Sequence, residues 1–224
     1  KIIYNLDDSI LTEVINQPEN HFGYGRSSGN VSGKVIDFHP TIEVEISYRD
    51  GKQNIKTALL GDFNLYNMLC AATVGEIFHI KSEIISKSLE SYTPSNHRSQ
   101  LIKTKTNIVI ADCYNANPTS TLAALQSLSS MKVENKVAIL GDMLELGENE
   151  EVEHQNIVQF MHENNISGLL VGGIFSNLKC NFPTFEKVEF ILPYLENMRY
   201  ENCTILIKGS RGIKLEKIIE NQIL

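Results

Sequence analysis

The second part of the chain alternates short apolar segments with helix-like ones, and this rhythm restricts the possible folds more than any other feature. It begins with NIVIAD (107–112) and PTSTLAALQSLSSM (118–131) and ends with CTILIKG (203–209) and IKLEKIIENQ (213–222). Between them come KVAILGD, EEVEHQNIVQFMHEN, GLLVGG, FPTFE and EKVEFILPYLENM. Short buried strands joined by helices predict an α/β fold with a mostly parallel, doubly wound sheet.

The first part of the chain is richer in strands. KIIYNL reads as a strand, DDSILTEVIN (7–16) as a short helix, and VSGKVIDFH (31–39) and NIKTALL as further strands. TIEVEISY (41–48) alternates apolar and polar residues, which predicts a half-exposed strand, and Asp50-Gly51 after it predicts a hairpin turn. NLYNMLCAATVGEIF and SEIISKSLESY follow as two helices, and the polar SYTPSNHRSQ (91–100) predicts a domain boundary.

Composition and charge exclude several classes of protein. The net charge is −7 and there is no long basic run, which argues against a nucleic-acid partner. The sequence has no apolar stretch of about 18 residues, so we expect no membrane span. The first residues do not resemble a signal peptide. Cysteines without CxxC spacing indicate free thiols in a cytoplasmic protein rather than disulfides or a zinc site; they are Cys70, Cys113, Cys180 and Cys203.

The glycine-rich run GYGRSSGNVSGK (23–34) imitates nucleotide-binding motifs without fulfilling them. A dinucleotide motif needs G-x-G-x-x-G, but the third glycine, Gly29, comes one position late. A P-loop would need glycine at Ser28 and a hydroxyl at Val35. We therefore expect a plain flexible loop, and a main phosphate cradle outside this chain if the protein handles ATP.

Polar residues gather where the predicted parallel strands end, and ligands bind at that edge of such sheets. In ADCYNANPTS, Asn117 suits a helix N-cap and Pro118 the first helical turn. Capping does not explain Asp112, Tyr114 and Asn115. A carboxylate can accept ribose hydroxyls, a phenol and an amide can bind phosphate or peptide groups, and the helix N-terminus favours an anion.

Two further strand ends carry candidate residues. In LGDMLELGENEEVEH, Asp142 points to the same edge, whereas the glutamates complement a helix dipole and His154 has either a structural or a catalytic role. In LIKGSRG, Lys208 and Arg211 flank Gly209-Ser210, which suits either a bound carboxylate or phosphate or a solvated turn.

The helix predicted from GDFNLYNMLCAA (61–72) carries Asn64 and Asn67 on one face, where two amides can read the edge of an adenine. Alternatively, Asn64 is only an N-cap. Arg98 in SNHRSQ is either a phosphate contact or a cation of the linker.

Together these motifs resemble the Mur ligase family. DCYNANPTS looks like the D-S-Y-N-A-N-P-T-S signature of its D-alanyl-D-alanine-adding members, and AILGDMLELGE and ILIKGSRG are similar to the two motifs that follow. GDFNLYNMLCAA looks like the G-x-H-N-x-x-N-A helix of the ATPase domain. Phe63 replaces the histidine, which would keep stacking on adenine but lose a ring-nitrogen hydrogen bond; Cys113 for serine is a mild change.

The resemblance implies three domains: one for the UDP-sugar, a central one with the ATP P-loop and a C-terminal Rossmann-like one. Residues 1–98 would be the end of the central ATP-binding domain and 99–224 the whole C-terminal domain, with a hinge at SYTPSNHR. The family's P-loop, Mg²⁺ ligands and modified lysine have no counterpart here. We therefore expect a piece of a longer protein, inactive alone, as the missing initiator Met also indicates.

The implied reaction is ATP-dependent amide formation for peptidoglycan precursor synthesis. ATP would convert the terminal carboxylate of UDP-N-acetylmuramoyl-tripeptide to an acyl phosphate, which the amine of D-Ala-D-Ala attacks. The cofactors would be ATP and Mg²⁺, with no metal ligand in this chain, no certain catalytic residue and a monomeric protein. The resemblance assigns ATP contacts to Asn64, Asn67, Arg98, Asp112, Tyr114, Asn115 and Asn117, and substrate contacts to Asp142, Lys208, Ser210 and Arg211.

Two other interpretations stay open. The chain could belong to another Mur or folylpolyglutamate-type ligase, although the other members carry residues different from Tyr-Asn-Ala-Asn at 114–117. It could also be a non-enzymatic Rossmann-like binding module that never had a P-loop.

Overall fold

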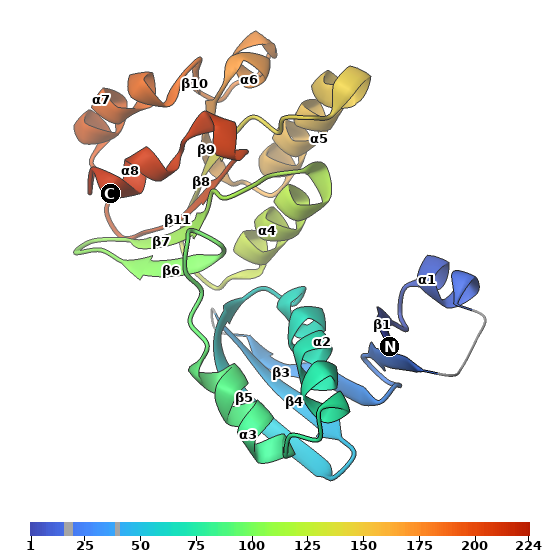
Figure 1. Cartoon of the computed structure of the whole chain (residues 1–224). Coiled ribbons are helices and arrows are strands. Elements are labelled where there is room, and N and C mark those ends of the chain that lie inside the picture. The colour runs from blue at the N-terminus through green and yellow to red at the C-terminus, as the bar shows by residue number, and fades with distance from the viewer. Residues whose placement is uncertain (16–19, 39–40) are drawn as a thin grey trace. The chain divides into compact units, whose positions relative to one another are not determined.

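The computed structural model describes residues 1–15, 20–38 and 41–224. The chain divides into two units, Lys1–Thr93 and Pro94–Leu224 (Figure 1). The predicted helix end at Asn16 and strand end at His39 lie outside the described residues. The finer boundary after residue 98 stays a prediction.

The second unit is built on a six-stranded sheet in the order β10-β9-β8-β11-β7-β6. All neighbouring strands are parallel except β6, which is antiparallel to β7. The strands are β6 (Gln100–Lys103), β7 (Ile108–Asp112), β8 (Asn135–Gly141), β9 (Ser167–Val171), β10 (Thr184–Phe185) and β11 (Cys203–Lys208).

Helices cover both faces of this sheet, as the alternating sequence predicts. Figure 1 shows α4 and α5 on one face and α7 and α8 on the other. The helices are α4 (Pro118–Ser130), α5 (Glu150–Glu163), α6 (Gly173–Asn177), α7 (Val188–Met198) and α8 (Glu216–Glu220), with 3₁₀ turns at Gly147–Asn149 and Arg211–Ile213. Leu125 and Leu128 of α4 are fully buried, and Ile191 of α7 packs with the strand residues Ile205 and Ile207. The doubly wound α/β architecture is confirmed.

Two elements of this unit escape sequence reasoning. The strand β6 has only four residues and lies at the sheet edge, so it carries little apolar signal. The helix α6 has five residues, which is too short for a helical period to show.

The start of α4 is a capping box. The Oδ1 of Asn117 accepts the N–H of Ser120, and the Ser120 Oγ accepts the N–H of Asn117. Pro118 stands at the first helical position, as expected.

Replacing Asn117 by Ala should therefore lower the free energy of unfolding by about 1 kcal/mol, because it removes an N-cap. Denaturant midpoints followed by circular dichroism measure this loss. Thr119→Ala is the matched control, since Thr119 is exposed, lies two residues after Asn117 and is not part of the capping box. Equal losses in both variants would contradict the capping role.

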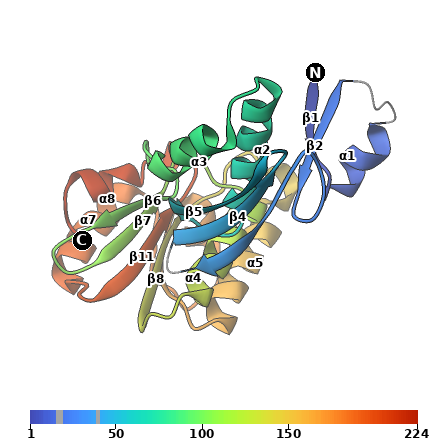
Figure 2. The ribbon, with the colours of Figure 1, turned by 90° about the horizontal axis from the view of Figure 1, so that it is seen from below.

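The first unit is a five-stranded sheet in the order β1-β2-β3-β4-β5. Its strands are β1 (Ile2–Asn5), β2 (His21–Gly25), β3 (Val31–Phe38), β4 (Thr41–Tyr48) and β5 (Gly51–Leu60), and its helices α1 (Ser9–Val14), α2 (Asn64–Ile77) and α3 (Ser82–Ser91). Alternate residues of β4 are buried, which confirms the half-exposed strand. The antiparallel β4 and β5 form the predicted hairpin, with Arg49 and Asp50 in the turn and Gly51 as the first residue of β5. Figure 2 shows α2 and α3 on the same side of β4 and β5.

The glycine-rich run 23–34 is not the plain loop that the sequence suggests. Its first three residues belong to β2 and its last four to β3, so only 26–30 connect the strands. A Cβ at Gly23 would lie 2.7 Å from the Leu6 side chain, and Gly29 has φ +122 with its Cβ position 2.5 Å from the Gly23 carbonyl oxygen. These glycines allow close packing and a tight turn, which is why they resemble a ligand-binding motif without being one.

In the part of the chain that the structure describes, no helix is both long enough and apolar enough to cross a lipid bilayer.

Candidate functional site

The candidate site lies in the second unit, where β7, β8 and β11 end at the same edge of the sheet. The parallel pairing brings together strand ends that are far apart in sequence. Lys208 at the end of β11 pairs in register with Asp112 at the end of β7, and with Leu140 of β8 on its other side. All three predicted strand-end motifs therefore meet here.

The centre of the site is an ion pair whose lysine is buried and whose carboxylate is partly exposed. The Lys208 Nζ lies 2.7 Å from the Asp112 Oδ2 and also donates to the carbonyl oxygen of Asn115 at 3.1 Å. The side chain of Lys208 is 4% exposed and that of Asp112 17%. The ammonium group thus joins the end of β7 to the loop that follows it.

The other oxygen of Asp112 reaches the segment that leads into β6. The Asp112 Oδ1 accepts the Ser99 N–H at 2.9 Å and the Ser99 Oγ–H at 3.2 Å. Ser99 has φ +49, a left-handed conformation that serine seldom adopts. The carboxylate therefore fixes a backbone conformation that is otherwise unfavourable.

An exposed cationic cluster adjoins this pair through Arg98, the neighbour of Ser99, and through Tyr114, two residues after Asp112. The Arg98 guanidinium carbon lies 3.7 Å from the centre of the Tyr114 ring, and that of Arg211 lies 5.6 Å from the same ring. Tyr114 is 40% exposed, and both arginines are exposed. The arrangement leaves guanidinium N–H groups facing solvent, where they can bind an oxyanion through paired hydrogen bonds.

The two asparagines of the loop make local contacts. The Asn115 Oδ1 accepts the Ala116 N–H, and the Asn117 side chain caps α4. Both residues are exposed and lie at the site edge. Their contact with ATP stays a prediction.

Ser210 connects all three strand ends. Its Oγ accepts the Leu144 N–H at 2.9 Å and donates to the Ala116 carbonyl oxygen at 3.4 Å, and its N–H donates to the Asp142 carbonyl oxygen. Ser210 is 5% exposed. The structure thus shows Ser210 holding loops together, and a contact with substrate stays a prediction.

Asp142 is buried beneath the same edge. Its two carboxylate oxygens accept the N–H groups of Ile174 and Phe175 in α6, at 2.9 and 3.0 Å. Gly172 lies directly against this carboxylate. These bonds anchor the start of α6, and the expected contact of Asp142 with a substrate stays a prediction.

His154 has structural contacts on both ring nitrogens. Its Nε2 accepts the Met143 N–H at 2.9 Å, so Nδ1 carries the proton and donates to the Glu150 carbonyl oxygen. The ring is fully buried and packs edge-on against Phe175 at 4.6 Å. Of the two roles considered for His154, the geometry favours the structural one.

In the first unit, Asn64 and Asn67 lie on one face of α2, as predicted. The Asn67 Nδ2 donates to the Asn64 Oδ1 at 2.9 Å, and the Asn64 Nδ2 donates to the Leu60 carbonyl oxygen. Asn64 is the first helical residue and not the N-cap, which is Phe63. Because Asn64 is buried and Asn67 exposed, Asn67 is better placed to bind a ligand, next to Phe63, which is 40% exposed.

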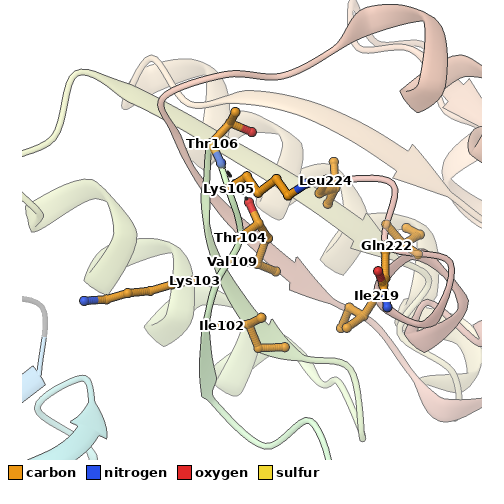
Figure 3. Close-up of a pocket in the computed structure, with 10 residues that line it drawn as sticks. Ile102, Lys103, Thr104, Lys105, Thr106, Val109, Ile219, Gln222 and Leu224 are labelled. Carbon is orange, nitrogen blue, oxygen red and sulfur yellow. Dashed lines mark hydrogen bonds between the residues drawn. The ribbon is translucent and has the colours of Figure 1, made fainter.

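A hollow of the second unit lies away from this site. It has a volume of about 830 Å³ and occupies the space between the β6–β7 turn and the C-terminal residues. Figure 3 shows Lys105 reaching over it toward Leu224, whereas Lys103 points away. It lies at the amino end of β7 and is lined by none of the predicted site residues.

Burial raises the pKa of the Cys113 thiol to about 12, and the nearby carboxylates of Glu216 and Asp112 act in the same direction. We expect alkylation at pH 8 to modify the half-buried Cys70 and Cys180 well before Cys113. Peptide mass spectrometry measures the order of modification.

The same environment predicts a pH dependence of stability. Because the thiol ionises at a lower pH in the unfolded chain, the free energy of unfolding of wild type should fall relative to that of Cys113→Ser as the pH rises above about 8.5. Rapid labelling of Cys113, or a constant difference, would contradict this environment.

Comparison with known proteins identifies the family. The model described as "Mur ligase, glutamate ligase domain" matches residues 97–211, and "Mur ligase middle domain" matches residues 1–75. The chain belongs to the Mur ligase family. The matches place the middle-domain portion in the first unit and the glutamate ligase domain in the second.

Individual Mur ligases align with the whole chain. The UDP-N-acetylmuramoyl-tripeptide--D-alanyl-D-alanine ligase of Buchnera aphidicola subsp. Baizongia pistaciae is 28% identical over 232 residues, covering 99% of this chain and 50% of the relative. Crystal structure I of MurF from Acinetobacter baumannii matches with a TM-score of 0.84 and 25% identity, over 99% of this chain and 51% of that one. MurF ligase from Thermotoga maritima in complex with ADP has the same fold, with a TM-score of 0.84 and 18% identity over 99% and 52%.

These alignments have two consequences. The Rossmann-like fold class expected for the C-terminal part is confirmed. The chain spans about half the length of the Mur ligases it matches.

Sequence reasoning missed one residue of the site in this Mur ligase, Ser99. It stands beside Arg98 in a polar linker, and nothing in its local sequence distinguishes it from a solvated serine. Only the distance to Asp112 reveals its role. Among the described residues, no cluster of three or more His, Cys, Asp or Glu side chains could hold a metal ion.

Proposed function

We propose that this chain is the C-terminal half of a ligase that joins D-Ala-D-Ala to UDP-N-acetylmuramoyl-tripeptide at the expense of ATP, in peptidoglycan precursor synthesis. The main support is the exposed cluster of Arg98, Tyr114 and Arg211 beside the Asp112–Lys208 pair. It is the part of the second unit that combines free guanidinium groups with the Tyr-Asn-Ala-Asn motif of the D-alanyl-D-alanine-adding members. The Buchnera relative carries that activity in its name.

The residues present suit a nucleotide. When bound, ATP would supply the phosphoryl group that activates the tripeptide carboxylate. The guanidinium group of Arg98 would hold phosphate oxygens by bidentate hydrogen bonds, and that of Arg211 would hold an oxyanion of the substrate. The partly exposed Asp112 carboxylate has lone pairs left to accept a ribose hydroxyl.

The first unit would bind the base. Asn67 would use its amide to read the adenine edge, with Asn64 behind it as the residue that orients it. Phe63 would stack on the ring. Tyr114, Asn115 and Asn117 would line the phosphate side, and Asp142, Lys208, Ser210 and Arg211 the substrate side.

The proposal also covers the domain boundary, the oligomeric state, the localisation and the metal ligands of the enzyme. The domain boundary lies between residues 98 and 99, and the protein is monomeric and cytoplasmic. Mg²⁺ is held by ligands outside this chain. Positioning and charge stabilisation, rather than a nucleophilic side chain, would account for the contribution of this half.

Replacing Asp112 by Ala in the complete ligase should raise the KM for ATP by an amount worth about 1–3 kcal/mol, because a charged hydrogen-bond partner is lost. Initial rates of phosphate release at varied ATP measure the effect. Asp112→Asn keeps one acceptor and should be affected less. An unchanged KM in Asp112→Ala would remove Asp112 from the ATP site.

The upstream coding sequence distinguishes this proposal from a binding module. A Gly-Thr-x-Gly-Lys-Thr stretch preceding residue 1 in the same reading frame supports a ligase. A stop codon followed by a native start would support a module without a P-loop. In isolation, the 224-residue chain should bind ATP weakly or not at all, as calorimetry can measure.

A further inference from the structure

Lys208 lies in a position that does not suit contact with a substrate. The residue is 3% exposed, within a strand whose six residues are all buried. Its ammonium group points to the Asp112 carboxylate and the Asn115 carbonyl oxygen. Asp112 is the last residue of β7 and Asn115 lies in the β7–α4 connection, so Lys208 is directed into the protein and not out of the site.

The contacts of Lys208 continue to the site surface. Asp112 uses one oxygen for Lys208 and the other for the backbone and hydroxyl of Ser99. Ser99 is in the left-handed region, and Arg98, its neighbour, stacks on Tyr114. A chain of direct contacts thus runs from the buried ammonium group to the exposed guanidinium group.

We propose that Lys208 is a positioning residue, which does not touch ATP or the peptide substrates but orients Asp112 and, through Ser99, Arg98. The statement that Lys208 does not contact ATP rests on the proposed function. The statement that Lys208 orients Asp112 and Ser99 concerns only the structure of this chain. It replaces the substrate contact that the family resemblance implies for Lys208.

Lys208 has this role because each oxygen of the Asp112 carboxylate must face a different partner. Asp112 ends its strand, and a free carboxylate there would rotate about its side-chain torsions. The short bond to Lys208 holds one oxygen inward, which leaves the second oxygen facing Ser99. A lysine suits this place because its compact ammonium group can donate to two acceptors in different directions.

Hydrogen exchange of the ¹⁵N-labelled chain tests the geometry without any assumption about activity. In Lys208→Met, which keeps the side-chain length without the charge, the Ser99 amide should exchange about tenfold faster or more, whereas the Ile205 amide inside β11 should not change. Lys103→Met, an exposed lysine of β6, is the control and should leave Ser99 unchanged. An unchanged Ser99 rate in Lys208→Met would overturn the proposal.

Lys208→Met leaves the mostly buried Asp112 carboxylate without its cationic partner and can destabilise the unit, so a double variant gives a second test. The KM for ATP of the complete ligase is compared in wild type, Lys208→Met, Asp112→Asn and the Asp112→Asn/Lys208→Met double variant. If Lys208 acts through Asp112, its removal raises KM about tenfold in wild type but changes it little once Asp112 is Asn. The same increase in both backgrounds would show direct contact of Lys208 with ATP and overturn the proposal. A wild-type ligase without amide-forming activity would refute the proposed function, while the Ser99 exchange result would still decide the geometry.

Discussion

Gly172→Ala is expected to lower the free energy of unfolding of the second unit by about 2–5 kcal/mol. Gly172 has φ +133, a conformation open almost only to glycine, and an added Cβ would lie 2.2 Å from the Asp142 carboxyl group. Asp142 cannot withdraw easily, because both of its oxygens bind the N–H groups that begin α6. Urea unfolding followed by circular dichroism measures the loss.

Gly147→Ala separates the two causes. Gly147 also has a positive φ, +59, but nothing lies within 4 Å of its Cβ position. The control should therefore lose only the cost of the left-handed conformation, about 1–2 kcal/mol. A loss in Gly172→Ala no larger than in Gly147→Ala would show that the contact with Asp142 is not restrictive.

Asp142→Ala should destabilise the same unit by about 2–4 kcal/mol, because it leaves the N–H groups of Ile174 and Phe175 without their acceptors. The same unfolding measurement applies, and amide exchange of Phe175 reports the loss locally. Asp8→Ala is a matched control, because Asp8 also accepts two N–H groups at a helix start but is only half-buried. Its loss should be about 1 kcal/mol. Equal losses in the two variants would mean that burial of the Asp142 carboxylate does not increase the free energy lost with its hydrogen bonds.

The parts of the fold that depend on neighbours in sequence could be predicted. The alternation of apolar strands and helices predicts the doubly wound sheet, because each segment carries its own period. Asn117 and Pro118 predict the start of α4, since a cap acts within one turn. Asp50-Gly51 predicts the hairpin for the same reason.

The contacts that define the site could not be predicted in this way. Local sequence does not determine strand order. The position of β11 between β7 and β8, and with it the pairing of Lys208 with Asp112, could therefore not be predicted. The sequence presents Lys208 as a cation of an exposed turn, whereas the strand register buries it. The same holds for Asp142, whose acceptor role depends on the short helix α6.

The structural role of the glycines was also hard to predict from the sequence. In the run 23–34, glycine supports close packing between strands and a tight turn, and at Gly172 it makes room for a carboxylate. In sequence both uses look like flexibility. Steric need at a particular backbone position can be recognised only when the neighbouring atoms are known.

The central claim is that this half serves a ligase for D-Ala-D-Ala, and product analysis of the complete protein tests it most directly. The enzyme would be incubated with ATP, UDP-N-acetylmuramoyl-tripeptide and either D-Ala-D-Ala or single amino acids, with mass spectrometry of the nucleotide product and a phosphate assay. The account predicts that D-Ala-D-Ala alone is added, with release of an equal amount of phosphate. Addition of a single amino acid in place of D-Ala-D-Ala, or no ATP-dependent product at all, would contradict it.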